Sequence, residues 1–349
     1  MLGEGNVATT VKPPTIQDVA RRAKVSTATV SRVLSNPDRV SPQARERVFE
    51  AVRETGYIIN EAARSLRMRS SRTIVAAMPH IGDPFYSTIL ETVIGTAAKR
   101  GYAVLATTKL EGAPNRWLND YVQSARADGL LIFDGSLETQ LLHELAPEGV
   151  SLPLVAAYDE PPDPQVNSVL TDNRAAAGRA VQHLIDIGHR RIAHVTGYSR
   201  TPAPNERLIG FLETMQAAGL EVADDWVLQG NYTMESGVAA AERLLACSER
   251  PTAVFCANDE SAIGLMAGLR GAGVHCPRDM SVIGFDDISV AAYIAPSLTT
   301  MRQPREAIGT IATSSVIDII EGAATQAAPL HIVLNAELVV RDSTAPLPG

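Results

Sequence analysis

The chain has 349 residues, of which 45% are hydrophobic and 20% charged, and its net charge is −8. The length suggests about two to three folding units, and the composition excludes a disordered or collagen-like chain. The longest apolar stretches are far shorter than the roughly 20 residues that span a bilayer, so no membrane association is expected.

Two further features restrict the class of protein. Residues 1–14 lack the basic and apolar regions of a secretory signal, which predicts a cytoplasmic protein. The three cysteines, Cys247, Cys256 and Cys276, have neither metal-site nor disulfide spacing, so we expect small core residues in a reducing compartment. No metal or cofactor is expected.

The charge is divided unequally along the chain. Residues 1–72 hold 13 Lys or Arg against seven Asp or Glu, a net +6, and the remainder carries −14. A basic head on an acidic body is typical of proteins in which only the head meets phosphates. This division predicts nucleic-acid binding by the first part of the chain.

Two helices are predicted at the start of the head. Thr15 and Asp18 have the spacing of a capping box, and apolar residues follow at helical intervals as far as Ala23. After a tight break, Ser26 is expected to cap a second helix that extends to Leu34. The shortness of the break predicts a helix-turn-helix.

A third helix is expected from Ser41–Pro42 to Gly56. In a helix-turn-helix the second helix lies in the major groove and presents its N-terminal residues to base edges. Arg32 can contact guanine bidentately, worth about 1–3 kcal/mol of discrimination; Thr27 offers a hydroxyl or a methyl, and Ala28 a methyl. Helix spacing alone also fits a small protein-binding module.

A longer series of residues narrows these alternatives. In chain order the series is Thr15–Ala20, Val25–Leu34, Val40–Ser41, Arg45, Val48, Gly56–Tyr57, Asn60 and Ala62–Leu66. It closely resembles the head of the LacI/GalR family of repressors. The resemblance implies that DNA is contacted by Thr15, Ser26, Thr27, Ala28, Thr29, Ser31, Arg32, Asn60, Ala63 and Leu66.

The resemblance also implies a hinge over residues 60–71. In the family, the segment matching Asn60–Arg67 becomes helical only on operator DNA, and the leucine matching Leu66 wedges into the central minor-groove step. An ordinary linker leucine that packs on the body is the alternative. Lys24 stands where the family usually has glycine and Ile59 where it usually has proline, so the turn and hinge geometry stay open.

After Ser71 the sequence changes to alternating strands and helices. Strand-like runs are Thr73–Met78, Tyr102–Thr107, Gly129–Phe133, Leu154–Tyr158, Ile192–Thr196, Ala253–Cys256 and Val282–Phe285, and helical segments include Phe85–Arg100, Asn173–Ile187 and Asp259–Arg270. This pattern predicts parallel sheets covered on both faces. The strands exceed one open sheet, so two lobes are expected, with a ligand between them at the carboxyl ends of the strands.

The body resembles the same family, whose core shares the fold of periplasmic sugar-binding proteins. The matching stretches are Asp172–Asn173, Gly188–Ile192, Arg207–Phe211, Ala257–Asp259, Ile283–Asp287 and Pro296–Thr300. The implied fold class is α/β, with an all-α helix-turn-helix head and a two-lobed parallel-sheet core. The implied parts are a flexible extension (1–14), the DNA-binding domain (15–59), the hinge (60–71), the effector-binding core (72–341) and a C-terminal tail (342–349). Within the core, the N-lobe is expected at about 72–171 and 303–330, and the C-lobe at about 172–302 and 331–341.

Seven residues match family positions that bind the effector between the lobes: Phe85, Tyr86, Asp159, Arg207, Tyr232, Asn258 and Asp286. Carboxylates and a guanidinium suit paired hydroxyls, and aromatic faces suit the apolar face of a sugar ring. Asp159 and Asp286 together disfavour a strongly anionic ligand, so a neutral sugar is favoured. Some of the seven can be structural instead; Asp159 can cap a helix, and Asp172, outside this set, is expected to cap one.

We therefore expect a bacterial, nucleoid-associated transcription regulator that represses carbohydrate-metabolism genes and binds near-palindromic operator DNA. No leucine heptads follow Arg341, so a homodimer is expected. A nucleobase or sugar phosphate as effector, and activation in place of repression, remain alternatives. A glycosidase would leave the DNA-binding head unexplained, a transport protein would need a signal peptide, and no catalytic motif is present; we expect no enzyme.

Overall fold

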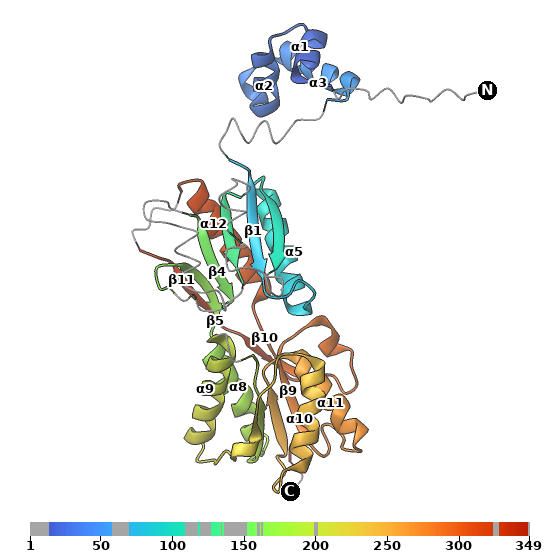
Figure 1. The fold of residues 1–349 in the computed structure, drawn as a ribbon, viewed down its shortest axis with the longest axis vertical. Helices are drawn as coiled ribbons and strands as arrows, with labels where there is room; N and C mark the ends of the chain where they lie inside the picture. Colours follow the sequence, from blue (N-terminus) through green and yellow to red (C-terminus); the bar gives the residue numbers. More distant parts are fainter. Residues whose placement is uncertain are drawn as a thin grey trace, which may run out of the picture. The chain divides into compact units, whose positions relative to one another are not determined.

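A computed structural model describes residues 14–57, 70–108, 118, 127–133, 135, 152–158, 161, 163–198, 202–323 and 328–347. Residues 1–69 and 70–349 form two separate compact units, here called the head and the core (Figure 1). The predicted site residues Asn60, Ala63, Leu66 and Asp159 lie outside the described residues.

The head contains α1 (Ile16–Ala23), α2 (Thr27–Ser35), the 3₁₀ turn η1 (Pro37–Arg39) and α3 (Pro42–Thr55). The backbone N–H and the hydroxyl of Thr15 both donate to Asp18, at 2.9 and 2.7 Å, and the Ser26 hydroxyl accepts from the Thr29 N–H at 3.1 Å. Gly56 ends α3 in the left-handed conformation. Apolar residues from all three helices meet in one core that includes Val19, Ala23, Val30, Val33, Val48 and Ala51. The caps and the turn chemistry thus form the predicted helix-turn-helix.

The core alternates strands and helices. Its first sheet contains β1 (Thr73–Met78), β2 (Ala103–Thr108), β3 (Gly129–Ile132), β4 (Leu154–Tyr158), β5 (Asn167–Thr171) and β11 (His331–Leu334), and its second contains β6 (Ile192–Val195), β7 (Val227–Leu228), β8 (Ala253–Cys256), β9 (Ser281–Asp286), β10 (Thr299–Arg302) and β12 (Glu337–Val339). The helices are α5 (Pro84–Lys99), α8 (Asn173–Asp186), α9 (Pro202–Ala217), α10 (Met234–Ala246), α11 (Asp259–Gly271) and α12 (Arg305–Ile320), with 3₁₀ turns η3 (Asp224–Trp226) and η4 (Ser289–Ala292).

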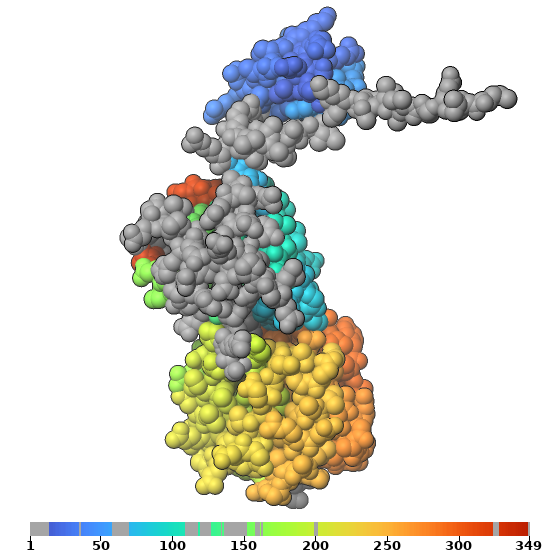
Figure 2. All heavy atoms as spheres, viewed as in Figure 1, coloured from blue at the N-terminus to red at the C-terminus, as the bar shows by residue number. Residues whose placement is uncertain are grey.

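Each sheet is the centre of one lobe (Figure 1). The strand orders are β11-β5-β4-β3-β1-β2 and β12-β10-β9-β8-β6-β7, and these neighbouring strands pair in parallel, except that β10 and β12 are antiparallel. Central strands such as β3, β6 and β8 are buried along their whole length, as expected of parallel sheets covered on both faces. Figure 2 shows side chains of α9 and α10 covering the second lobe.

The chain passes between the two sheets in three short segments, at residues 171–173, 303–304 and 335–336. We call this region the lobe junction. The predicted lobe boundary, which assigned residues 331–341 to the second lobe, is wrong at β11, because β11 pairs with β5 of the first sheet. Residues 331–334 therefore belong to the first lobe and not to the second. The sequence pattern of this short, partly exposed edge strand was too weak for the strand to be recognised.

The C-terminal residues pack on the second lobe. The Ser343 hydroxyl donates to the Val282 carbonyl at 2.6 Å, and the ring of His189 lies 3.1 Å from the Ala345 carbonyl and 3.0 Å from the Ser281 hydroxyl. His189 is buried, because Ser281 and Ala345, from two distant segments, enclose it. None of the described helices is long and apolar enough to cross a membrane.

Candidate functional sites

The predicted recognition residues share one exposed face of α2. Thr27, Ala28 and Arg32 are exposed, and Ser31 beside them is half-buried. Val30 and Val33 on the opposite face are fully buried in the head core. The face therefore presents a guanidinium, hydroxyls and methyl groups, the kinds of group that contact base edges.

Three other predicted DNA contacts serve the local fold. Thr15 is the N-cap of α1 and Ser26 the N-cap of α2, and the hydroxyl of Thr29 lies 2.9 Å from that of Ser26. Lys24 ends α1 with φ 53° and ψ 47°, the left-handed region that non-glycine residues enter at a cost. This explains why glycine is usual at that position, and the helix-turn-helix forms with lysine nonetheless.

Arg207 lies at the centre of the second candidate site. Its side chain has no exposed surface and donates from Nε to Asn173 Oδ1 at 2.9 Å and from Nη1 to the Ala257 carbonyl. The guanidinium carbon lies 3.7 Å from the centroid of the Phe285 ring. Asn173 in turn donates to the Thr171 carbonyl at 3.1 Å, so Arg207 is connected to the first segment of the lobe junction.

Asp286 ends β9 and is connected to the second segment of the junction. Its Oδ1 accepts from Gln303 Nε2 at 2.7 Å. Burial raises the pKa of Asp286 well above its ordinary value, the positive charge of Arg207 opposes that shift, and the carboxylates of Asp259 and Asp83 add to it. Since Asp83 caps α5 of the first lobe, a carboxylate of the first lobe raises the pKa of a carboxyl group of the second.

Asn258 and Tyr232 form a structural pair. Asn258 caps α11 by accepting from the Ser261 N–H at 3.0 Å, and its Nδ2 donates to the Tyr232 carbonyl at 2.8 Å. Tyr232 has a φ of 70°, and its ring lies so close to Gly197 that a Cβ there would be 2.1 Å from Cζ. Asn258 thus fixes the backbone that carries the Tyr232 ring.

Phe85 and Tyr86 begin α5 in the first lobe, where their ring centroids lie 5.0 Å apart in an edge-to-face arrangement. Both rings are buried within the hydrophobic core. The Phe85 N–H donates to Asp83 Oδ1 at 2.8 Å, so the cap that starts α5 also places the aromatic pair.

Sequence reasoning missed three polar atoms at the lobe junction. Among the described residues, Thr171 Oγ1, Gln303 Oε1 and Arg305 Nε are buried without a hydrogen-bond partner. Buried polar groups in folded proteins are nearly always paired. Their position at the junction, beside the partners of Arg207 and Asp286, is what a site for a polar ligand would have; nothing local in the sequence identified them.

Sequence reasoning also missed His194, which lies on β6. Its Nδ1 donates to the Phe255 carbonyl at 2.9 Å, and its ring stacks on Phe255 and Phe211 at centroid distances of 4.7 and 5.2 Å. Complete burial lowers the pKa of His194 to about 4, and Arg207 contributes to that shift. His194 is therefore neutral near pH 7.

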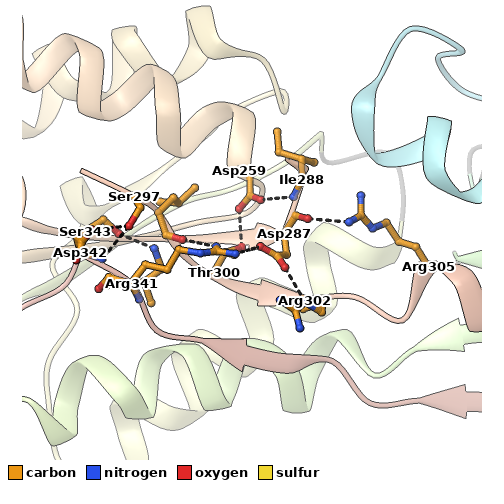
Figure 3. A network of polar contacts seen from close by, with 12 residues as sticks. Asp259, Asp287, Ile288, Ser297, Thr300, Arg302, Arg305, Arg341, Asp342 and Ser343 are labelled. Carbon is orange, nitrogen blue, oxygen red and sulfur yellow. Dashed lines mark hydrogen bonds and ion pairs between the residues drawn. The ribbon is translucent and has the colours of Figure 1, made fainter. Parts of the chain in front are cut away.

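A polar network adjoins the junction in the second lobe (Figure 3). Asp259, fully buried, accepts from the Thr300 hydroxyl at 2.5 Å and from the Ile288 N–H at 2.8 Å, and burial raises its pKa to about 7. Asp287 accepts from Arg302 Nε at 2.7 Å and from Arg341 Nη2 at 2.6 Å. These bonds hold the end of β9, where Asp286 is located.

The described residues contain no cluster of His, Cys, Asp and Glu that could hold a metal ion. The second site instead combines a guanidinium, carboxyl groups, amides and aromatic rings, which can hold a small molecule by hydrogen bonds and ring packing. Together with the helix-turn-helix head, this defines the class of DNA-binding proteins that carry a ligand-binding core.

Comparison with known proteins identifies the family. Residues 15–60 match the bacterial regulatory proteins of the lacI family, and residues 181–344 match the periplasmic binding protein-like domain. The chain is 36% identical to the HTH-type transcriptional repressor CytR of Escherichia coli K12 over 96% of this chain and 97% of CytR. It is 34% identical to the repressor PurR of Vibrio cholerae over 95% and 98% of the two chains. The chain belongs to the lacI family of DNA-binding transcriptional repressors, as the resemblance predicted, and these relatives are regulators and not enzymes.

Solved structures agree on the fold. A lac repressor dimer bound to operator and the anti-inducer ONPF superposes with a TM-score of 0.85 at 26% identity, covering 96% of this chain and all of the other. A complex of the transcriptional regulator CelR with cellobiose superposes with a TM-score of 0.71 at 34% identity, covering 95% and 99%. The predicted fold class is thereby confirmed.

Proposed function

We propose that this repressor binds a near-palindromic operator through the exposed face of α2. The observation that supports it is the set of outward side chains at Thr27, Ala28, Ser31 and Arg32 above a buried apolar face. The lac repressor of similar fold is bound to operator. Phosphate contacts by the basic head would supply affinity, and Arg32 would supply preference for one base.

The second part of the proposal is a small polyhydroxylated effector, a neutral sugar, at the lobe junction. Arg207 and Asp286 support it: both are buried, and both are bonded to junction residues, Asn173 and Gln303. A sugar hydroxyl can donate and accept, so it suits guanidinium, carboxyl and amide groups at once. The CelR relative is complexed with cellobiose. The proposed set is completed by Asp159, which lies outside the described residues, and by Phe85, Tyr86, Tyr232 and Asn258.

Positive and negative groups lie close together at the lobe junction, so the charge of the ligand affects whether it can bind there. After burial, the carboxylates of Asp259 and Asp83 raise the pKa of Asp286 further, whereas the guanidinium of Arg207 lowers it. A strongly anionic ligand would add negative charge beside these carboxyl groups, which favours a neutral one. A nucleobase also matches paired donors and acceptors and is the second candidate.

We propose that the regulator works as a homodimer, which would place two heads on the two half-sites. Tyr293 is 87% exposed and Val290, in the same turn region, is 40% exposed; tyrosine is enriched at protein interfaces. Effector and operator would then be linked: an effector that favours the geometry without DNA weakens operator binding by the factor by which operator weakens effector binding. Such coupling is typically about 1–3 kcal/mol. An effector that favours the DNA-bound geometry would act as a co-repressor.

Thermal unfolding of the full chain with sugars, sugar phosphates and nucleobases tests the effector class. A ligand at 100 times its dissociation constant adds about 2.7 kcal/mol to stability, enough for a clear shift. A shift with one neutral sugar is expected, and loss of that shift in Arg207→Lys would place the ligand at the junction. Shifts confined to phosphorylated compounds or nucleobases would contradict a neutral-sugar effector.

A further inference from the structure

The first residues of the core are held by one carboxylate. Asp128, which precedes β3, accepts from the Ser70 hydroxyl at 2.5 Å, the Ser71 N–H at 2.7 Å and the Arg72 N–H at 2.8 Å. We call Ser70–Arg72 the hinge root, because the predicted hinge, residues 60–71, ends there. Any change in its position would be passed to the segment that leads to the head.

The end of α12 is connected to the hinge root. Arg72 has φ 50°, its guanidinium lies 5.0 Å from the Tyr102 ring centroid, and its Nη1 lies 4.0 Å from Glu321 Oε1. Glu321, the C-cap of α12, also pairs with Arg100 at 2.6 Å, and Arg100 donates to Asp318 at 3.1 Å. Arg100 follows the last residue of α5, so both helices end at this cluster.

The start of α12 is connected to the opposite lobe. Arg305, its first residue, is buried and donates from Nη2 to the Asp287 carbonyl at 2.7 Å (Figure 3). Its Nη1 lies 3.4 Å from the Thr88 hydroxyl on α5. Asp287 is itself fixed by Arg302 and Arg341, directly after Asp286 of the proposed effector site.

Between these ends α12 is tightly packed. A Cβ at Gly309 would lie 3.1 Å from the Ile89 carbonyl of α5, and one at Gly129 of β3 would lie 2.9 Å from Val316 and 2.8 Å from Ile320. Sixteen residues of helix span about 24 Å. A helix so closely packed on both sides moves as one body, since packed interiors do not deform continuously.

We propose that α12, together with α5, carries movement at the lobe junction to the hinge root, with Arg305 and Glu321 as the positioning residues at its two ends. Displacement of β9 relative to the first lobe would pull or release Arg305 through the Asp287 carbonyl. The far end of the same helix would then move Arg72 through Glu321 and Arg100. This coupling rests on the proposed function, in which an effector at the junction alters operator affinity.

Exposed ion pairs such as those of Glu321 contribute little stability, so their expected role is to set geometry. If α12 couples the two sites, a substitution at one end of the helix should change the dynamics at the other end without unfolding the lobe. A purely structural role would not produce that effect. Arg305→Lys keeps the charge but replaces the two-nitrogen fork with a single ammonium. Glu321→Gln keeps the size but removes the charge that faces Arg72 and Arg100.

Hydrogen exchange of the full-length chain, without DNA or small molecule, tests the coupling. The Ser71 and Arg72 amides report on the hinge root, and the Ile288 amide, which donates to Asp259, reports on the junction. Arg305→Lys should speed exchange at Ser71 and Arg72 by about threefold or more, and Glu321→Gln should do the same at Ile288. Glu213→Gln, which removes an exposed interhelical ion pair with Arg174, should change neither.

If each substitution changes exchange at its own end only, α12 does not couple the two sites. The same conclusion follows if Glu213→Gln produces the same pattern, because the effect would then be a general loss of stability. Neither DNA nor effector takes part, so this failure leaves operator binding untouched. Conversely, if the full-length chain showed no preference for any DNA sequence, the proposed function would be overturned, and the exchange result would be unchanged.

Discussion

Replacing Arg207 with lysine tests the centre of the proposed effector site. Lysine keeps the positive charge opposite Asp286 but has one ammonium in place of a planar fork. It can retain a bond to Asn173 or to the Ala257 carbonyl, but not the geometry of both, and it loses the flat contact with Phe285. The substitution therefore separates charge from shape.

The expected loss of stability follows from these contacts. A hydrogen bond to a charged group contributes about 1.5–3 kcal/mol, and a desolvated cation–π contact about 2 kcal/mol, part of which an ammonium retains. The sum is a fall of about 2–4 kcal/mol in the free energy of unfolding. An effector that lost one such bond would bind about 10- to 100-fold more weakly.

Urea unfolding followed by circular dichroism measures the first quantity, and titration of the ligand found by thermal shift measures the second. Arg174→Lys is the matched control, because Arg174 pairs with Glu213 at the surface of the same lobe and is half exposed. We expect less than about 0.5 kcal/mol there. If Arg207→Lys matched Arg174→Lys in stability and bound the ligand normally, the role assigned to the Arg207 fork would be refuted.

Four further predictions concern the head, the hinge, the dimer and pH. Arg32→Ala should relax base preference at one position of each half-site, measured by binding to single-base operator variants; an equal loss on every variant would make Arg32 a phosphate contact. Leu66→Ala should weaken specific operator binding and leave ligand binding intact, and unchanged operator affinity would exclude the wedge. Tyr293→Asp should shift sedimentation from dimer to monomer, and a persistent dimer would exclude this surface from the interface. His194 has a folded-state pKa lowered to about 4, below the ordinary 6.5, so the unfolded chain binds more protons between these values. The contribution of neutral His194 to stability should be complete above pH 6.5 and fall by about 3 kcal/mol towards pH 4. The difference in urea midpoint between the parent chain and His194→Gln should therefore change over this range, and a constant difference would refute it.

The head was predictable because its signals are local. Thr15, Ser26, Pro42 and Gly56 mark helix ends within a few residues of where they act, and all four mark the observed ends of α1, α2 and α3. The turn geometry at Lys24, which the sequence left open, is also a local property, since it depends on the left-handed backbone of this one residue.

Strands of the core were predictable where burial makes them continuously apolar. β8 and β9 lie at the centre of the second sheet and are buried throughout. By contrast, β10 was missed, because Thr299 and Thr300 are polar in sequence although both are fully buried. Their hydroxyls are satisfied by Arg341 and Asp259, more than 40 positions away, and no local pattern reveals such partners.

In the candidate effector site, too, some residues could be predicted from the sequence, whereas the contacts that hold them could not. Arg207 and Asp286 were identified by resemblance, but their partners Asn173 and Gln303 depend on how three chain segments cross between the sheets. His189 is buried because the C-terminal residues fold over it, and no local pattern in the sequence predicts that burial. Long-range contacts decide these cases.

Selection of DNA by the full-length chain tests the central claim most directly. Duplexes of random sequence would be enriched on the purified protein, sequenced, and their affinity measured against a scrambled duplex at fixed salt. The account predicts a near-palindromic sequence with two half-sites, bound about 10³-fold or more tightly than the scrambled duplex. Enrichment of no sequence, or equal affinity for both duplexes, would contradict it.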